Sequence, residues 1–247
     1  MFTEDSYSTE TIRNYPKHVN WDFICKYQSL SIEEIEEFKE HIPWAVFSSY
    51  CDKDEVLDRF ENFICWKQVG IVKQISERSL RKYFDRFDIK VVSSNQVLSE
   101  GFIRDYAERL DWSLISCKQN KLSENIIREF SDKVVWYKIS YYQKLSESFI
   151  REFKDKVDWK SISYNQKLSE DFIREFVDKV DWHTVSRYQE LSKAFIYEFY
   201  EKIDLKKILM NERVINGQKL PGIFKDAPKD FKLTTILKDR DLAYLFS

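Results

Sequence analysis

The chain has 247 residues, 43% of them hydrophobic and 33% charged, with a formal net charge of −2. This balance is typical of an ordinary soluble protein and not of a disordered one, and no apolar run approaches the roughly 18–20 residues that a membrane span needs. The absence of a basic excess argues against a general affinity for polyanions. With four glycines and four prolines, the chain is expected to be mainly helical.

Two features predict an intracellular protein. The first six residues lack the basic region and the apolar stretch of a signal peptide. The four cysteines have no paired spacing, which favours reduced thiols over a disulfide framework. They are Cys25, Cys51, Cys65 and Cys117.

One motif recurs with a fixed period. Its clearest copy runs from Leu168 to Trp182. The tryptophan position is filled in turn by Trp21, Trp44, Trp66, Ile89, Trp112, Trp136, Trp159, Trp182 and Leu205, at intervals of 22 to 24 residues. A period in this range is the signature of a repeat array.

The repeats are predicted to form one domain, with atypical units at both ends that cap the array. Their expected boundaries are 7–29, 30–51, 52–74, 75–97, 98–121, 122–144, 145–167, 168–190 and 191–219, followed by a degenerate C-terminal cap at 220–247. The longest interval places one extra residue in the loop 117–121.

Within a repeat, the spacing of Phe172, Ile173, Phe176 and Val180 follows one face of a helix of roughly 11 residues. Ser169 precedes this helix as an N-cap, with acidic residues in the first turn. Asp181 is a second cap, before a helix of roughly seven residues that begins near the tryptophan. Each repeat is therefore predicted to be a helical hairpin.

A single hairpin cannot fold alone. Seven apolar side chains contribute roughly 10–20 kcal/mol when buried, whereas ordering a repeat costs roughly 35 kcal/mol. Neighbouring hairpins must cover each other, which predicts an all-α fold: an α-solenoid, or superhelix, of about ten hairpins. The tryptophans are expected in its structural core: Trp21, Trp44, Trp66, Trp112, Trp136, Trp159 and Trp182.

The segment from Asp158 to Glu170, Asp-Trp-Lys-Ser-Ile-Ser-Tyr-Asn-Gln-Lys-Leu-Ser-Glu, resembles a short helical repeat found in proteins of amoeba-infecting giant DNA viruses and their satellite viruses, the virophages. The match is best over 121–193 and elsewhere covers only the apolar skeleton. The resemblance implies an all-helical repeat protein of viral origin, in the host cytoplasm, the viral factory or the virion. It transfers no catalytic residues.

No motif for catalysis or metal binding is present. The recurring aspartates, such as Asp111, Asp158 and Asp181, are explained as caps, since catalysis needs one site rather than many equivalent ones. The three histidines lack ligand spacing, and no phosphate loop or nucleophile motif occurs. We therefore expect a non-enzymatic protein without cofactor or metal.

Glutamines recur in the turn after the second helix of a repeat. An amide row of this kind could hold an extended peptide backbone, or it could satisfy carbonyl groups at helix ends, and the regular position favours the structural role. The glutamines are Gln28, Gln96, Gln119, Gln143, Gln166 and Gln189.

Two residues after the tryptophan, the side chains are apolar in the first half of the chain and polar in the second. If this position faces solvent, it forms an apolar stripe for a partner; if the early repeats pack differently, it is buried. The candidate partner-binding residues are Phe23, Val46, Val91, Leu114, Tyr141 and Tyr164.

An alternative is nucleic-acid binding by a row of lysines, with tyrosines that stack on bases. The candidate contacts are Lys138, Lys160, Lys206 and Lys207. The low net charge disfavours this alternative. The sequence thus predicts a protein-interaction or scaffold module with unidentified protein partners or self-association, and no membrane association.

Overall fold

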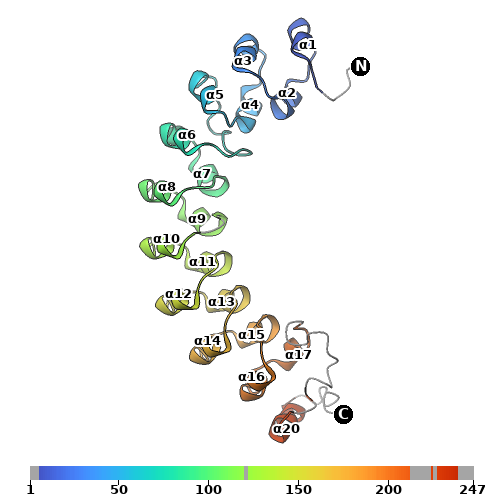
Figure 1. Cartoon of the computed structure of the whole chain (residues 1–247), viewed down its shortest axis with the longest axis vertical. Helices are drawn as coiled ribbons and strands as arrows, with labels where there is room; N and C mark the ends of the chain where they lie inside the picture. Colours follow the sequence, from blue (N-terminus) through green and yellow to red (C-terminus); the bar gives the residue numbers. More distant parts are fainter. Residues whose placement is uncertain (1–5, 120–121, 212–223, 225–226, 239–247) are drawn as a thin grey trace. The chain divides into compact units, whose positions relative to one another are not determined.

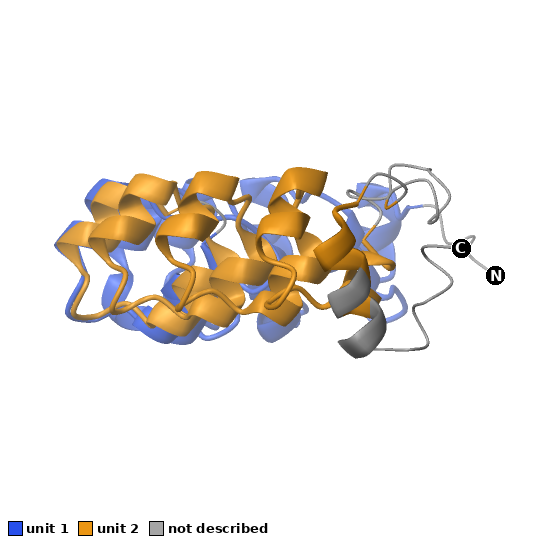
Figure 2. Ribbon diagram, turned by 90° about the horizontal axis from the view of Figure 1, so that it is seen from below, with its two compact units in different colours: residues 1–119 blue, residues 120–247 orange. Residues whose placement is uncertain are grey.

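The computed structural model describes residues 6–119, 122–211, 224 and 227–238. The chain divides into two compact units, Met1–Gln119 and Asn120–Ser247 (Figure 2), which are described separately. The regular structure of the described residues is entirely helical. Short helices follow one another at regular intervals and pack on their neighbours, so the predicted all-α solenoid is confirmed.

Each regular repeat contributes a first and a second helix, and in each unit these form two layers (Figure 1). The first unit contains α1 (Thr9–Asn14), α2 (Trp21–Tyr27), α3 (Ile32–Phe38), α4 (Trp44–Tyr50), α5 (Asp54–Arg59), α6 (Glu77–Lys82), a 3₁₀ turn η1 (Phe84–Arg86), α7 (Ile89–Asn95), α8 (Glu100–Asp105) and α9 (Trp112–Lys118). The second unit contains α10 (Glu124–Glu129), α11 (Trp136–Tyr142), α12 (Glu147–Glu152), α13 (Trp159–Asn165), α14 (Glu170–Glu175), α15 (Trp182–Tyr188), α16 (Lys193–Glu198), α17 (Leu205–Ile208) and α20 (Lys229–Lys238).

The lengths of the two helices differ from expectation in one respect. The second helix has seven residues, as in α15, which agrees with the prediction. The first helix was expected to have roughly 11 residues and has six, as in α14. The chain turns at Phe176, whose carbonyl accepts the N–H groups of Lys179 (2.9 Å) and Val180 (3.1 Å). Apolar spacing continues through this turn, so the pattern did not show where the helix ends.

The predicted caps are present. The Ser169 hydroxyl accepts the N–H of Phe172 at 3.1 Å, and the Asp181 carboxylate accepts the N–H of Thr184 at 2.8 Å. These bonds satisfy N–H groups that a helix start leaves without a partner. At the starts of α4, α5 and α11 the capping residue makes no side-chain hydrogen bond; these residues are Pro43, Lys53 and Val135.

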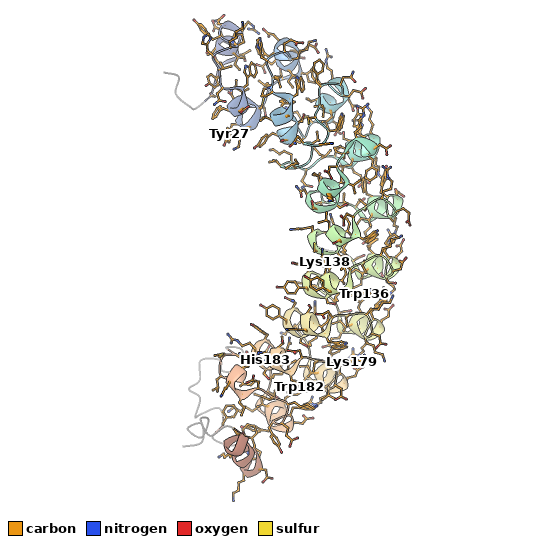
Figure 3. All side chains as sticks on the ribbon, turned by 180° about the vertical axis from the view of Figure 1, so that it is seen from behind. Tyr27, Trp136, Lys138, Lys179, Trp182 and His183 are labelled. Carbon is orange, nitrogen blue, oxygen red and sulfur yellow. The ribbon has the colours of Figure 1, made fainter. Side chains whose placement is uncertain are left out.

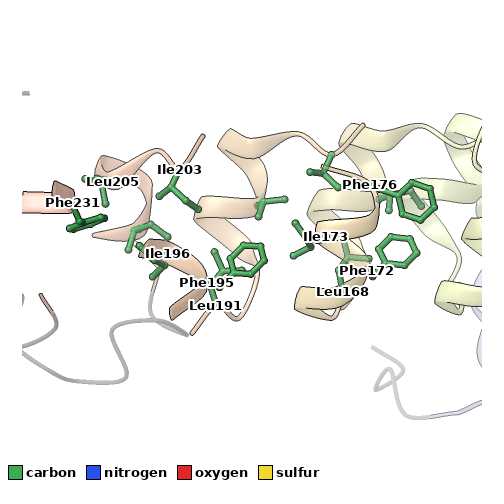
Figure 4. Packing of buried hydrophobic residues seen from close by; sticks show 14 of the residues in the cluster. Leu168, Phe172, Ile173, Phe176, Leu191, Phe195, Ile196, Ile203, Leu205 and Phe231 are labelled. Carbon is green, nitrogen blue, oxygen red and sulfur yellow. The ribbon is translucent and has the colours of Figure 1, made fainter. Parts of the chain in front are cut away.

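The core of the second unit lies between the two layers (Figure 4). The first helices α12, α14 and α16 each supply a Phe-Ile pair, such as Phe172 and Ile173, and both side chains are fully buried. The same pair recurs as Phe195 and Ile196. Phe231 of α20 extends the core at its end and packs edge-on against Tyr197, with ring centroids 4.8 Å apart.

The tryptophans of the second unit, Trp136, Trp159 and Trp182, pack at the edge of this core. All seven tryptophans of the chain are half-buried. Each indole N–H donates to a carbonyl five residues earlier, as Trp159 does to Lys154 at 2.9 Å. The ring also contacts the next repeat, where the centroid of Phe176 is 4.8 Å from that of Trp159. The polar N–H holds one edge of the ring near the surface.

Recurring glutamines such as Gln119, Gln166 and Gln189 join successive repeats. The Gln166 Nε2 donates to the carbonyls of Ser140 (3.3 Å) and Gln143 (2.8 Å) in the preceding repeat, and its Oε1 accepts the N–H of Leu145 at 3.0 Å. The side chain is buried. The amide therefore has the structural role that the spacing favoured, although it satisfies carbonyls of the preceding repeat and not of its own.

A second row of polar side chains was not anticipated. Ser163 is fully buried. Its hydroxyl donates to the carbonyl of Trp159 at 2.7 Å and accepts the N–H of Asp181 at 3.0 Å. The same bond to the next repeat is made by Ser48, Ser93, Ser140, Ser163 and Ser186.

The repeat predicted at 52–74 departs from the hairpin pattern, because no helix follows Trp66. Gly70 occupies the position of the buried serine and has φ +82°, a conformation that favours glycine. A Cβ at Gly70 would approach the Gln96 Nε2 to 2.9 Å. This nitrogen instead donates to the Gly70 carbonyl at 2.7 Å.

The two units meet in sequence within the loop where an extra residue was predicted. Most of the predicted cap at 220–247, and the end of the repeat at 191–219, lie outside the described residues. The four cysteines have free thiols.

Candidate functional site

The first helices of the second unit carry charges that neutralise one another. Arg174 pairs with Glu198 of the next repeat at 2.8 Å and with Asp171 of its own helix at 2.9 Å. The same contact between repeats joins Arg128 to Glu152 and Arg151 to Glu175. Exposed pairs of this kind contribute little stability. These ion pairs do, however, engage the charged side chains that a charged partner would need on the layer of first helices.

The second helices differ in charge. We call the solvent-facing side of α11, α13, α15 and α17 the second-helix face. These helices contain no Asp or Glu, and their cationic residues are Lys138, Lys160, Arg187, Lys206 and Lys207. Figure 3 labels Lys138 and His183 on these helices, and Lys179 in the turn after the first helix α14.

A groove of about 420 Å³ opens on this face. It is lined by Tyr137, Tyr141, Asp158, Lys160, Ser161, Tyr164 and Thr184. The rings of Tyr141 and Tyr164 are nearly parallel, with an interplanar angle of 9° and centroids 6.2 Å apart. Tyr188 meets Tyr164 edge-on at 4.4 Å. Four exposed aromatic rings from three successive repeats therefore lie along one face.

Local sequence explains this gathering. Tyr137 and Tyr141 are four residues apart in α11, so both lie on the same side of the helix. The repeat period places Tyr164 at the same position in α13 as Tyr141 in α11. Because α11 packs on α13 and α13 on α15, these side chains form a continuous surface.

Capping aspartates lie at the starts of the second helices. Asp158 accepts the N–H of Ser161 at 2.9 Å and also lines the groove. Burial alone would raise the pKa of Asp181, but hydrogen bonds from Thr184 and the charges of Lys160 and His183 lower it below its ordinary value. Asp181 is therefore ionised at neutral pH, as a cap requires.

Three of the predicted binding residues come together in this groove: Tyr141, Tyr164 and Lys160. Lys206 is exposed on α17, whereas Lys138 and Lys207 are half-buried. Tyr137, Arg187 and Tyr188 were not among the predicted binding residues. Tyr137 and Tyr188 are exposed, and Arg187 is half-buried.

The other candidates occupy a less exposed position. Phe23, Val46, Val91 and Leu114 are each half-buried. Phe23 packs on Tyr27, with ring centroids 5.0 Å apart. In the second unit the same position holds Ser161 and Thr184, which are buried. This position therefore lies against the neighbouring repeat, and it exposes less surface than the tyrosines do.

The exposed apolar residues of the first unit include a group near the irregular segment. Ile71, Val72 and Val97 are exposed. Val97 is tied to this segment because its N–H donates to the Gln74 Oε1 at 2.9 Å.

Within the described parts of the chain, no group of three or more His, Cys, Asp or Glu residues could hold a metal ion. In the same residues, no helix is long and apolar enough to cross a membrane. No protein-family model matches the sequence, and neither a curated protein nor a solved structure matches it. The class is therefore defined by the fold alone: an α-solenoid of short helical repeats.

Proposed function

We propose that the protein is a non-enzymatic scaffold that binds a protein partner through the second-helix face of residues 120–247. The groove between Tyr137, Tyr141 and Tyr164 is the observation that supports it most directly. Tyrosines supply a large contact area at low entropic cost and are enriched among residues that dominate binding energy. The two buried polar rows are not available to a partner, because they join the repeats.

Affinity capture from cells that express the protein tests this function. We expect a partner that survives nuclease treatment and is lost when Tyr141 and Tyr164 are both replaced by Ser. Tyr27→Ser is the matched control, because Tyr27 is exposed but lies in the first unit. Equal recovery of the partner by the double variant and the wild type would refute a binding role for the groove.

The second candidate is nucleic-acid binding on the same face. Lys160 beside Tyr141 and Tyr164 is the observation that favours it, since cations and stacking rings together bind single strands. In the capture experiment this function predicts a partner that disappears with nuclease. Binding would also weaken steeply as salt rises.

We also propose, on the sequence resemblance alone, a viral origin and a location in the host cytoplasm, the viral factory or the virion. Immunofluorescence in infected amoebae, with mass spectrometry of purified virions, tests this proposal. Detection in uninfected cells would contradict it.

A further inference from the structure

Resting on the function proposed above, we infer the chemistry of the partner: an extended peptide with an aromatic or aliphatic anchor, followed about three to six residues away by acidic side chains. The anchor would enter the tyrosine-lined groove, and the acidic side chains would reach the cations of α15 and α17. The order of side chains along the second-helix face supports this.

Two rows of side chains run along this face. One residue after the tryptophan position, the row reads Tyr137, Lys160, His183 and Lys206; five residues after it, the row reads Tyr141, Tyr164, Arg187 and Met210. Residues from both rows line the groove, so the rows share one face. In these two rows the tyrosines lie on α11 and α13 only, whereas the cations begin with Lys160 on α13 and continue with Arg187 and Lys206.

The dimensions fit an extended chain. Packed helices lie about 8–10 Å apart, so α15 and α17 are roughly 8–20 Å from α13. An extended peptide covers this distance in about three to six residues, at roughly 3.3 Å per residue. Its alternate side chains lie about 6.6 Å apart, which is close to the 6.2 Å between the Tyr141 and Tyr164 rings.

The charges favour an acidic peptide over a nucleic acid. Each nucleotide of a single strand carries a phosphate, so a strand along this face would place phosphates against Asp158 in the aromatic part of the groove. His183 already has an acidic neighbour, with its Nδ1 3.1 Å from the Asp204 Oδ2. The cations Arg187 and Lys206 lie beyond the tyrosines. A partner with an apolar anchor at one end and acidic side chains toward the other matches this arrangement better than a uniform polyanion, which would also place charge against Asp158.

Fluorescence anisotropy on the full chain tests the proposal with defined peptides. The main probe is a labelled peptide with one Phe, a spacer of five Gly and Ser residues, and three Glu. One comparison peptide has Gln in place of Glu, and another has the same composition with Phe placed among the Glu residues. A labelled ten-nucleotide oligo-dT is the nucleic-acid probe. These comparisons use the wild-type protein, so they do not depend on whether any variant folds.

We expect the main probe to bind at least tenfold more tightly than either comparison peptide and more tightly than oligo-dT. Tyr141→Ser with Tyr164→Ser should weaken it at least tenfold, and so should Arg187→Gln with Lys206→Gln. Lys154→Gln with Lys193→Gln is the matched control for charge. Both lysines are exposed outside the second-helix face, so this variant should bind like the wild type. Unchanged melting temperatures confirm that the variants are folded.

Equal affinity for the main probe and either comparison peptide would overturn the proposed partner chemistry. Tighter binding of oligo-dT would do the same and support the nucleic-acid alternative. If the capture experiment finds a nuclease-resistant partner that needs Tyr141 and Tyr164, while the main probe does not bind, only the partner chemistry is wrong. If the capture experiment finds no such partner and the main probe does not bind, the proposed function is rejected as well.

Discussion

Replacing Gln166 with Ala tests how much the glutamine row contributes to stability. Gln166 is buried and makes three hydrogen bonds, two to carbonyls of the preceding repeat and one to the Leu145 N–H at the start of its own repeat. The variant leaves the Leu145 N–H and the Gln143 carbonyl without this partner. Each such group costs about 1–3 kcal/mol when buried. We therefore expect the free energy of unfolding to fall by roughly 2–6 kcal/mol.

Two measurements detect the effect of Gln166→Ala. Urea unfolding monitored by tryptophan fluorescence gives the loss of stability, analysed as a repeat array because such chains need not unfold in one step. Amide hydrogen exchange reports the local effect, since the Leu145 N–H should lose its protection before the rest of the second unit does.

Asn165→Ala is the control. Asn165 is the neighbouring residue, is exposed, and makes one long bond to the Ser161 carbonyl at 3.4 Å. Its replacement should cost less than about 1 kcal/mol. If Gln166→Ala cost as little, the amides would not join the repeats, and their availability to a peptide partner would have to be considered again.

Three further perturbations test other parts of the fold. Cys51 occupies the glutamine position beside a cavity of about 60 Å³ that Leu30 also lines. In urea unfolding, Cys51→Gln should raise the free energy of unfolding by about 1–3 kcal/mol, because the amide can form new hydrogen bonds. A loss of stability would show that the cavity does not fit an amide. Ser163→Ala removes the acceptor of the Asp181 N–H, so thermal unfolding should show a loss of about 1–3 kcal/mol, and no loss would contradict the role of the serine row. Hydrogen bonds from a lysine, an arginine and a tyrosine lower the pKa of Asp58 in the folded protein. The ionised carboxylate therefore stabilises the fold above the unfolded-state pKa of about 3.9, and this stabilisation is lost as the pH falls below that value. Asp58→Asn should flatten the dependence of unfolding free energy on pH below about pH 4, and an unchanged curve would refute this.

Much of the fold could be predicted because each repeat carries its own local signals. Ser169 and Asp181 cap helices through bonds to residues three positions later, so their roles are readable within one repeat. The Ser163 bond to Asp181 spans 18 residues and depends on how repeats stack. The recurrence of the serine was visible, but its partner was not. The helix end at Phe176 was missed because no Gly or Pro marks it.

The candidate site was only partly predictable for a similar reason. The sequence contained the tyrosines and lysines, but their exposure depends on the packing of each second helix. Tyr141 and Tyr164 are exposed, whereas Leu114 is half-buried and Ser161 is buried. The sequence left open whether this position is exposed or buried, and in the structure it is half-buried or buried.

Site-specific photocrosslinking tests the binding role of the second-helix face most directly. Tyr164 would be replaced by p-benzoylphenylalanine, and cells that express the protein would be irradiated. We predict an adduct that protease digests and nuclease leaves intact. The same group at Glu175, an exposed residue of the first helix α14, should give none. An adduct at Glu175 but not at Tyr164, or one at Tyr164 that nuclease removes, would contradict protein binding by this face.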